Sequence, residues 1–423
     1  CLFLCSLLAK QTLVTLPCLL LLLDFWPLER LTKTSLTRRL LEKIPFAVVA
    51  AAFCLIAYRA QASGGAIQSL AAIPFPQRLL NAVLSYGLYL SKIVVPWKLA
   101  FFYPHPSTIS LVDVALPALV LIGVTAVAVV EVRRLPFLFV GWCWFLGTLV
   151  PLIGLVQIGR QQMADRYAYF PAIGLYVAAA WSVPVLFDRI GLRRFRPFLA
   201  TAVVGLYAAL GFVQVGYWRN NDTLFRHALA VVAENSMTRG FYGTALIEEG
   251  RVAEGLSQCR RAVNLAPNDS LARRQLANAL LAAGDEREAL KEFTVALSLD
   301  ERSPGTHCQL AAVLSRLGRF PEAETHFRRA LEIDSACTPA YLGLAEICRA
   351  KKDYPEAVAW NEKALQYDST LFAARAGIAR ALWAEGRTDE AIARLQSGRA
   401  LSPEEDQAYA ELIAALTTAE RPR

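Results

Sequence analysis

The sequence predicts an all-α protein in two parts, a polytopic transmembrane helical domain followed by an α-helical solenoid. Two observations lead to this prediction. The first 219 residues contain several apolar runs of about 20 residues, the length of helix that crosses a bilayer. The rest of the chain repeats small residues with a 34-residue period, which indicates an array of helical repeats.

The composition also divides into two unlike halves. Hydrophobic residues make up 55% of the 423 residues and mean hydropathy is +0.36, yet 19% of the residues are charged. Residues 1–219 carry about 19 Lys and Arg against about 7 Asp and Glu, so the net charge of +8 divides into roughly +12 and −4. The positive excess lies in the membrane part, where it favours topology-setting loops. The soluble part has no basic excess, and we expect no nucleic-acid partner.

The chain begins at Cys1 inside an apolar run, so we expect an N-terminally truncated fragment. The nine cysteines include no CxxC pair, and the four histidines show no ligand spacing. We therefore predict no metal site and interpret most cysteines as small core residues.

Residues 1–219 are predicted to contain about six spans and one ambiguous segment. The spans are Cys1–Leu23, Ile44–Tyr58, Leu111–Val130, Leu135–Val156, Tyr167–Phe187 and Pro197–Tyr217. Polar residues interrupt Leu79–Trp97, which either crosses the membrane or lies on its surface or re-enters it. The positive-inside rule places the basic loops Arg30–Lys43, Glu131–Arg134 and Asp188–Arg196 together in the cytoplasm only if Leu79–Trp97 does not cross.

We therefore predict a surface or re-entrant segment there, which puts everything after Trp218 on the extracytoplasmic side. The expected location is multi-pass in a membrane, the inner membrane of a bacterium, with the solenoid outside the cytoplasm. Contact with membrane lipid follows from the same prediction.

The stretch Gln157–Pro171, QIGRQQMADRYAYFP, places charge between two apolar runs. Arg160, Asp165 and Arg166 form either an ion-paired helix cap or a site for a phosphate or an acidic substrate at the water boundary. Lys10 is a second isolated charge, 14 residues before Asp24, which is about 21 Å along one continuous helix. Lys10 either snorkels to the interface or faces an anionic headgroup.

Small residues recur at several fixed offsets in the second half. Gly250, Gly284, Gly318 and Gly386 form one 34-residue ladder with Lys352 at the missing step, and Ala289, Ala323, Ala357 and Ala391 form another with Gly255 in its first place. This pattern resembles the tetratricopeptide repeat, in which small residues let paired helices approach closely. It predicts five repeats over 236–405, a capping helix and tail over 406–423, and a junction over 220–235 that holds a partial repeat helix.

A groove between such repeats usually binds a peptide or a partner protein. Arg274 and Asn278 resemble the first members of a carboxylate clamp, but Gln309 replaces the usual asparagine, and Pro339 and Gly343 stand where cations are needed. The alternative is a solvated concave face.

With the runs LLAKQTLVTLPCLLLLLDFWPL and VVPWKLAFFYP, the membrane part resembles the later portion of a GT-C class glycosyltransferase. Together with the repeats, the whole chain resembles the transmembrane and tetratricopeptide-repeat O-mannosyltransferase family and its bacterial relatives. The resemblance implies transfer of a mannose-like sugar from a lipid-linked donor, a polyprenyl phosphate, to a protein acceptor on the extracytoplasmic face. Whether a divalent cation is a cofactor stays open.

The resemblance implies catalytic carboxylates in an early loop, which would precede Cys1, so the catalytic residues themselves are unknown. It assigns phosphate contacts to Lys10, Arg160 and Arg166, with Asp165 orienting Arg166 and with Tyr167 or Tyr169 at the carrier headgroup. The alternatives are a non-catalytic membrane-anchored scaffold for protein–protein interaction and an inactive relative of the enzymes.

Overall fold

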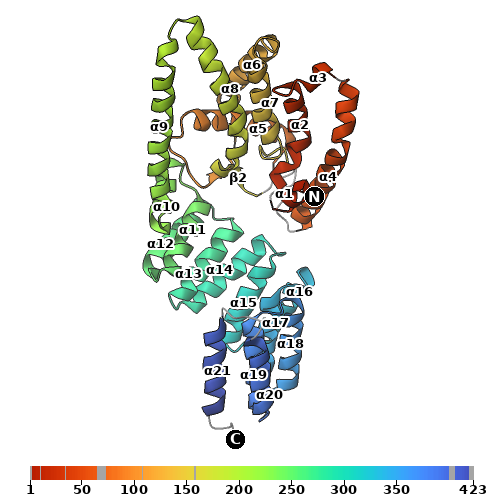
Figure 1. Cartoon of the computed structure of the whole chain (residues 1–423). Coiled ribbons are helices and arrows are strands. Elements are labelled where there is room, and N and C mark those ends of the chain that lie inside the picture. The colour runs from red at the N-terminus through yellow and green to blue at the C-terminus, as the bar shows by residue number, and fades with distance from the viewer. Residues whose placement is uncertain are drawn as a thin grey trace. The chain divides into compact units, whose positions relative to one another are not determined.

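A computed structural model describes residues 2–9, 11–33, 35–63, 73–106, 108–156, 159–399 and 405–418. The chain divides into two compact units, Cys1–Thr238 and Arg239–Arg423, and both consist almost entirely of helices (Figure 1). The all-α prediction is therefore confirmed, with the solenoid in the second unit.

The first unit combines helices with one pair of very short strands. Its elements are α1 (Leu2–Ala9), η1 (Gln11–Thr15), α2 (Leu16–Phe25), α3 (Arg30–Lys33), α4 (Leu36–Ser63), α5 (Phe75–Val94), β1 (Tyr103–Pro104), α6 (Leu111–Val130), α7 (Pro136–Leu149), β2 (Gln161–Met163), η2 (Asp165–Tyr167), α8 (Tyr169–Arg189), η3 (Arg193–Phe195), α9 (Arg196–Tyr217) and α10 (Asn221–Val231).

Four helical segments among the described residues are long and apolar enough to cross a membrane: Leu36–Ala62, Leu111–Val130, Tyr169–Arg189 and Arg193–Tyr217. Two shorter apolar helices, Leu13–Phe25 and Pro136–Leu149, overlap two other predicted spans. No residue of α9 is buried, and the side chain of its Phe212 is 83% exposed. Such uncovered apolar surface is typical of helices that face lipid.

Several predicted spans have different boundaries in the structure, and Leu135–Val156 is helical only over α7, Pro136–Leu149. Two differ further. The first is not the one continuous helix that the sequence predicted, because the 3₁₀ turn η1 separates α1 from α2. The second, Ile44–Tyr58, is only part of the 28-residue helix α4. The start of α4 was predicted to belong to the basic loop Arg30–Lys43, but Arg38, Arg39 and Lys43 lie within the helix.

An ion-pair cluster explains how those charges fit. Asp24, 1% exposed at the end of α2, lies 2.8 Å from Nη1 of Arg30 and 2.7 Å from Nζ of Lys43. Arg39 pairs with Glu42 one turn away, at 2.7 Å. A buried carboxylate retains its charge when cations lie this close, so the cluster ties α2 to the first turns of α4.

Helices α7 and α8 pack closely through two glycines (Figure 1). A Cβ on Gly141 would lie 2.3 Å from the carbonyl oxygen of Gly174, and a Cβ on Gly174 would lie 2.4 Å from that of Gly141. Small residues at such a crossing let two backbones approach within a membrane.

The strands β1 and β2 pair antiparallel, with Tyr103 opposite Met163 and Pro104 opposite Gln161. The pairing joins two loops whose residues are about 60 positions apart in the sequence. It is the one strand pair in the described part of the first unit, and it was not predicted.

The second unit is a series of antiparallel helix pairs (Figure 1). The pairs are α11 (Ser236–Glu248) with α12 (Val252–Leu265), α13 (Ser270–Ala282) with α14 (Glu286–Leu299), α15 (Pro304–Arg316) with α16 (Phe320–Ile333), α17 (Thr338–Ala350) with α18 (Tyr354–Tyr367), and α19 (Phe372–Ala384) with α20 (Thr388–Arg399). A final helix, α21 (Asp406–Thr418), follows at the predicted capping position.

The glycine ladder marks the turn between the helices of each pair. Gly250, Gly284, Gly318 and Gly386 all have φ between +74° and +85°, a region that is unfavourable for residues with a Cβ. Lys352, the missing step of the ladder, has φ +63°. The repeat thus imposes the left-handed turn whatever residue occupies the position.

The first repeat has glycines where the later repeats have alanines. A Cβ on Gly243 would lie 2.5 Å from Sγ of Cys259 and 2.8 Å from the carbonyl oxygen of Gly255. Helices α11 and α12 therefore approach more closely than a pair of alanines would permit.

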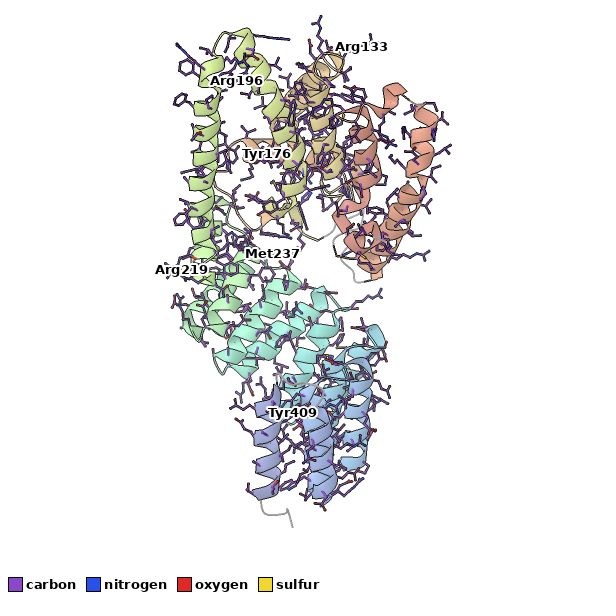
Figure 2. The ribbon with its side chains drawn as sticks, in the orientation of Figure 1. Arg133, Tyr176, Arg196, Arg219, Met237 and Tyr409 are labelled. Carbon is purple, nitrogen blue, oxygen red and sulfur yellow. The ribbon has the colours of Figure 1, made fainter. Side chains whose placement is uncertain are left out.

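The helices at the two ends of the repeats pack differently. In α10, predicted as a partial repeat helix, Ala228 packs in the core of the first unit together with Tyr89 and Tyr103. Tyr409 of α21, labelled in Figure 2, is fully buried. Its ring meets Phe372 edge-on, with the ring centres 4.7 Å apart. The capping helix thus covers the apolar end of the last repeat.

Candidate functional site

The ambiguous segment Leu79–Trp97 corresponds mostly to α5, and several of its polar residues face the interior of the first unit. Asn81 and Ser85 are fully buried. Tyr86 donates a hydrogen bond to the carbonyl oxygen of Leu146 at 2.7 Å, and Asn81 reaches that of Ile153 at 3.5 Å. Two of the polar side chains that interrupt the hydrophobic pattern therefore bind backbone carbonyl groups at and beyond the end of α7.

Asp165 is the centre of a polar cluster next to the β1–β2 pair. Its Oδ2 accepts a hydrogen bond from the hydroxyl of Tyr103 at 2.8 Å and one from the backbone N–H of Ala100 at 2.9 Å. Lys92, from the end of α5, lies over the Tyr103 ring with its Nζ 4.7 Å from the ring centre. The cluster thus unites residues from α5, β1 and η2.

Burial dominates the electrostatics of this cluster. It raises the pKa of Asp165, although the Tyr103 hydroxyl, Lys92 and the Ala100 N–H each favour the carboxylate. Burial also lowers the pKa of Lys92, against the attraction of Asp165. A carboxyl group in this setting takes up a proton more readily than a surface aspartate does, and it can serve as a proton acceptor.

The prediction that Asp165 orients Arg166 is wrong. The hydrogen bonds of the Asp165 carboxylate go to Tyr103 and Ala100, and Arg166 instead contacts Gln161 and Tyr167, with Cζ 4.9 Å from the Tyr167 ring centre. The partners of Asp165 lie more than 60 residues away in sequence, which explains why local spacing suggested the adjacent arginine.

The other predicted residues of this site are distributed around the same loop. Arg166 and Tyr167 lie together with Gln161, whose Nε2 is 3.2 Å from the Tyr167 hydroxyl. Arg160 is exposed, and its carbonyl oxygen accepts a hydrogen bond from the N–H of His105 at 3.1 Å. Tyr169, the first residue of α8, is 78% exposed and does not join the cluster. Lys10 lies outside the described residues.

In the second unit, the predicted groove residues lie on neighbouring first helices of two repeats. Arg274 and Asn278 are on α13, and Gln309 is on α15. A Cβ on Gly305 would lie 3.2 Å from Nη1 of Arg274, so the guanidinium reaches the start of α15. All three side chains are half-buried, as expected for a groove wall.

A pocket of about 130 Å³ lies two repeats further along, between α17, α18 and α19. It is lined by Leu342, Ala345, Glu346, Arg349, Ala357, Asn361, Ala373, Gly377 and Arg380. Its small residues make room, because a Cβ on Gly377 would lie 2.6 Å from Oδ1 of Asn361. Asn361 is 3% exposed and donates a hydrogen bond to the carbonyl oxygen of Ala357.

Two arginines give the pocket a positive side. Arg349 forms an ion pair with Glu346 on the same helix, and that hydrogen bond raises the pKa of Arg349. Arg380, from α19, is exposed and makes no ion pair within the described parts of the chain. A carboxylate that enters the pocket would meet a cation not already neutralised by a neighbour.

The 34-residue spacing of the repeats indicates two residues of this pocket. Glu346 and Arg380 occupy the repeat position of Asn278, two and three 34-residue steps further along. No comparable signal points to Tyr103, because β1 and η2 meet only in the folded chain.

Comparison with known families agrees with the helix pairs. A family model described as the tetratricopeptide repeat matches residues 304–368, and a second with the same description matches residues 350–416. The second unit contains tetratricopeptide repeats. No curated protein matches the chain.

Solved structures resemble part of the chain. A thermophilic tetratricopeptide-repeat protein of Thermus thermophilus is 21% identical, with 44% of this chain and 100% of that chain covered and a TM-score of 0.39. YrrB, described as a tetratricopeptide-repeat protein with an unusual peptide-binding site, is 16% identical, with coverages of 46% and 98% and a TM-score of 0.34. MamA is 16% identical, with coverages of 41% and 94% and a TM-score of 0.35.

Proposed function

We propose that this chain is a membrane-anchored protein whose tetratricopeptide repeats bind a peptide that carries an acidic group. Domains of these repeats bind peptides or partner proteins, and the repeats suggest a scaffold for protein–protein interaction. The observation behind the proposal is the pocket between α17 and α19, where Arg380 lies without an ion-pair partner among the described residues.

The chemistry of the pocket fits an extended peptide. Arg380 can bind a carboxylate through two parallel hydrogen bonds, and the Glu346–Arg349 pair offers both an acceptor and a donor beside it. Ala345, Ala373 and Gly377 leave space for a backbone to approach closely. The occupant that matches these groups is a peptide with a C-terminal carboxylate or an acidic side chain.

Peptide arrays test the proposal. The full-length chain, purified in detergent, is incubated with peptides that end either in a free carboxylate or in an amide. We expect preferential binding of acidic peptides and a loss of affinity of about 10-fold or more for Arg380→Ala, since a charged hydrogen bond contributes ~1.5–3 kcal/mol.

Arg287→Ala is the matched control, because Arg287 is an exposed arginine of α14 outside the pocket. Equal binding by wild type and Arg380→Ala, or no preference for acidic peptides, would remove the pocket from the proposal.

A second candidate function is the transfer of a sugar from a polyprenyl-phosphate donor, as the resemblance of the membrane half implies. The Asp165 cluster favours it, because a half-buried carboxyl group with a raised pKa next to Lys92 and Tyr103 is suited to proton transfer. Arg160 and Arg166 lie on the same loop as candidate phosphate contacts.

A transfer assay with a polyprenyl-phosphate mannose donor separates the two functions. If the chain is an enzyme, we expect Asp165→Asn to lower the rate at least 100-fold and Arg166→Ala or Lys10→Ala to weaken donor binding. Peptide binding in the repeat groove should be unchanged in all three variants. Transfer at an unchanged rate by Asp165→Asn would remove the Asp165 cluster from this candidate function.

We also propose that the basic loops are cytoplasmic and that the repeats are extracytoplasmic. Figure 2 shows Arg133 and Arg196 toward one end of the first unit and Arg219 toward the opposite end. Figure 1 shows that α3 lies at the same end of the unit as Arg133 and Arg196. Helix α4 begins just after α3, and α6 ends just before Arg133, so both helices have these ends at the side of Arg133. The segment that connects the end of α4 to the start of α6, which contains α5, therefore starts and ends at the side of Arg219. This arrangement supports a re-entrant α5.

A further inference from the structure

Two cysteines of the second unit lie in contact, although 29 positions separate them in the sequence. Cys308 is on α15 and Cys337 is the N-cap residue of α17, and their Sγ atoms are 3.4 Å apart. Both are free thiols. A disulfide bond is about 2.05 Å long, so side-chain movements that bring the sulfurs about 1.4 Å closer are enough to form one.

The two thiols differ in exposure. Cys308 is 7% exposed and packs in the core of the repeats, whereas Cys337 is half-buried and can be reached from solvent. The hydrogen bond with Cys308 lowers the pKa of Cys337, which favours the thiolate form of Cys337. The same contact and burial raise the pKa of Cys308.

The remaining cysteines of the second unit do not share these properties. Cys259 is fully buried and burial raises its pKa to about 12. Cys348 is 8% exposed, and burial raises its pKa to about 11. Thiols of this kind are poor nucleophiles at neutral pH. The unit therefore contains one accessible thiolate with one resolving thiol beside it.

We propose that Cys308 and Cys337 form a reversible disulfide that joins α15 to the start of α17. The oxidant is a small disulfide, such as oxidised glutathione. The Cys337 thiolate attacks one sulfur of that disulfide, forms a mixed disulfide and releases one thiolate. Cys308 then loses its proton to solvent, attacks Sγ of Cys337 and releases the second thiolate. In total two cysteine thiols are oxidised and one external disulfide is reduced to two thiols.

The bond would connect two consecutive repeats. In a repeat array, stability depends on the interfaces between neighbours, so a covalent link between α15 and α17 restrains one such interface. It also closes a loop of 29 residues in the unfolded chain, which reduces the freedom of that state. Oxidation is expected to raise the midpoint temperature of unfolding, and reduction to reverse the change.

The experiment uses the full-length chain in detergent, equilibrated with reduced and oxidised glutathione in defined ratios, with unreacted thiols then blocked by a maleimide. Trypsin leaves Cys337 and Cys348 on one peptide, so a second cleavage after Glu346 separates them. Mass spectrometry is expected to find the Cys308 peptide linked to the Cys337 peptide. Cys259 and Cys348 should remain reduced.

Cys348→Ser is the matched control and should form the same link with the same rise in midpoint temperature. Cys337→Ser should lose both, and because Cys337 is half-buried this substitution leaves the core intact. A link that involves Cys348 in place of Cys337, or full maleimide labelling of Cys308 and Cys337 in oxidised glutathione, would overturn the proposal.

Discussion

At the scale of single residues, Lys352 shows a conflict between side chain and backbone. It adopts φ +63° at the position where four other repeats have glycine. A left-handed conformation costs a residue with a Cβ roughly 1–2 kcal/mol, and glycine avoids most of that cost. The sequence analysis identified Lys352 as the irregular step, and the structure shows that the repeat keeps its turn at this residue.

We expect Lys352→Gly to stabilise the second unit by about 1 kcal/mol, which corresponds to a rise in Tm of ~2–4 °C for a unit of this size. Thermal unfolding followed by circular dichroism measures the shift. Lys352→Ala separates the backbone effect from the loss of charge, because alanine removes the charge but keeps the Cβ. An equal rise for alanine and glycine would contradict the backbone explanation.

Two histidines of the third repeat form another residue-scale feature. Nδ1 of His307 lies 3.0 Å from Nδ1 of His326, and Nε2 of His307 lies 3.2 Å from the carbonyl oxygen of Glu301. A carbonyl oxygen can only accept a hydrogen bond, so Nε2 of His307 carries a proton. When His307 is neutral, its Nδ1 therefore accepts a hydrogen bond from Nδ1–H of His326. The two rings cannot both be charged in this geometry.

Burial lowers the pKa of both His307 and His326 in the folded chain. The unfolded state therefore binds more protons below its pKa of about 6.5, and the stability of the second unit is expected to fall as the pH drops below that value. Thermal unfolding from pH 7.5 to pH 5 measures the slope. His326→Asn retains a hydrogen-bond donor that does not titrate, so the stability of this variant should depend less steeply on pH. An unchanged pH dependence would exclude the histidine pair as its cause.

At the scale of elements, the crossing of α7 and α8 in the first unit is a close contact between two helices. Gly141 and Gly174 each lie against the carbonyl oxygen of the other. Adding a methyl group there forces the helices apart, which costs ~1–3 kcal/mol in a tightly packed interior.

Gly141→Ala is accordingly expected to lower the unfolding temperature of the chain in detergent. Gly147→Ala is the matched control on α7, because a Cβ at Gly147 would meet nothing within 4 Å. If both substitutions had the same effect, helix propensity and not the crossing would be responsible.

The elements also show what a sequence can and cannot predict. The 34-residue ladder predicted the helical repeats, because the contacts of a repeat array are local and periodic. The ion pairs of Asp24 with Arg30 and Lys43 and the inward polar face of α5 depend on neighbours that periodicity does not identify. The contact of Asp165 with Tyr103 joins residues 62 positions apart, so local spacing singled out Asp165 but did not predict its partner.

At the scale of the whole molecule, the ends of the helices of the first unit lead to a prediction of sidedness. The test uses intact membranes whose extracytoplasmic face is exposed to the medium. We expect a membrane-impermeant maleimide to label Arg219→Cys in them, and to label Arg133→Cys only after permeabilisation. Both residues are exposed and lie toward opposite ends of the first unit (Figure 2). Wild-type protein gives the background from the native cysteines. Labelling of both positions from one side would contradict the topology and, with it, the re-entrant assignment of α5.

The glycine pair of the first repeat has a consequence for protein engineering. Gly243 and Gly255 set a helix spacing in α11 and α12 that the Ala–Ala pairs of the later repeats do not share. The modules of this solenoid are therefore not equivalent. A shuffled chain in which a later repeat replaces the first would begin with a wider module, whereas exchanges among the later repeats preserve the spacing at this crossing.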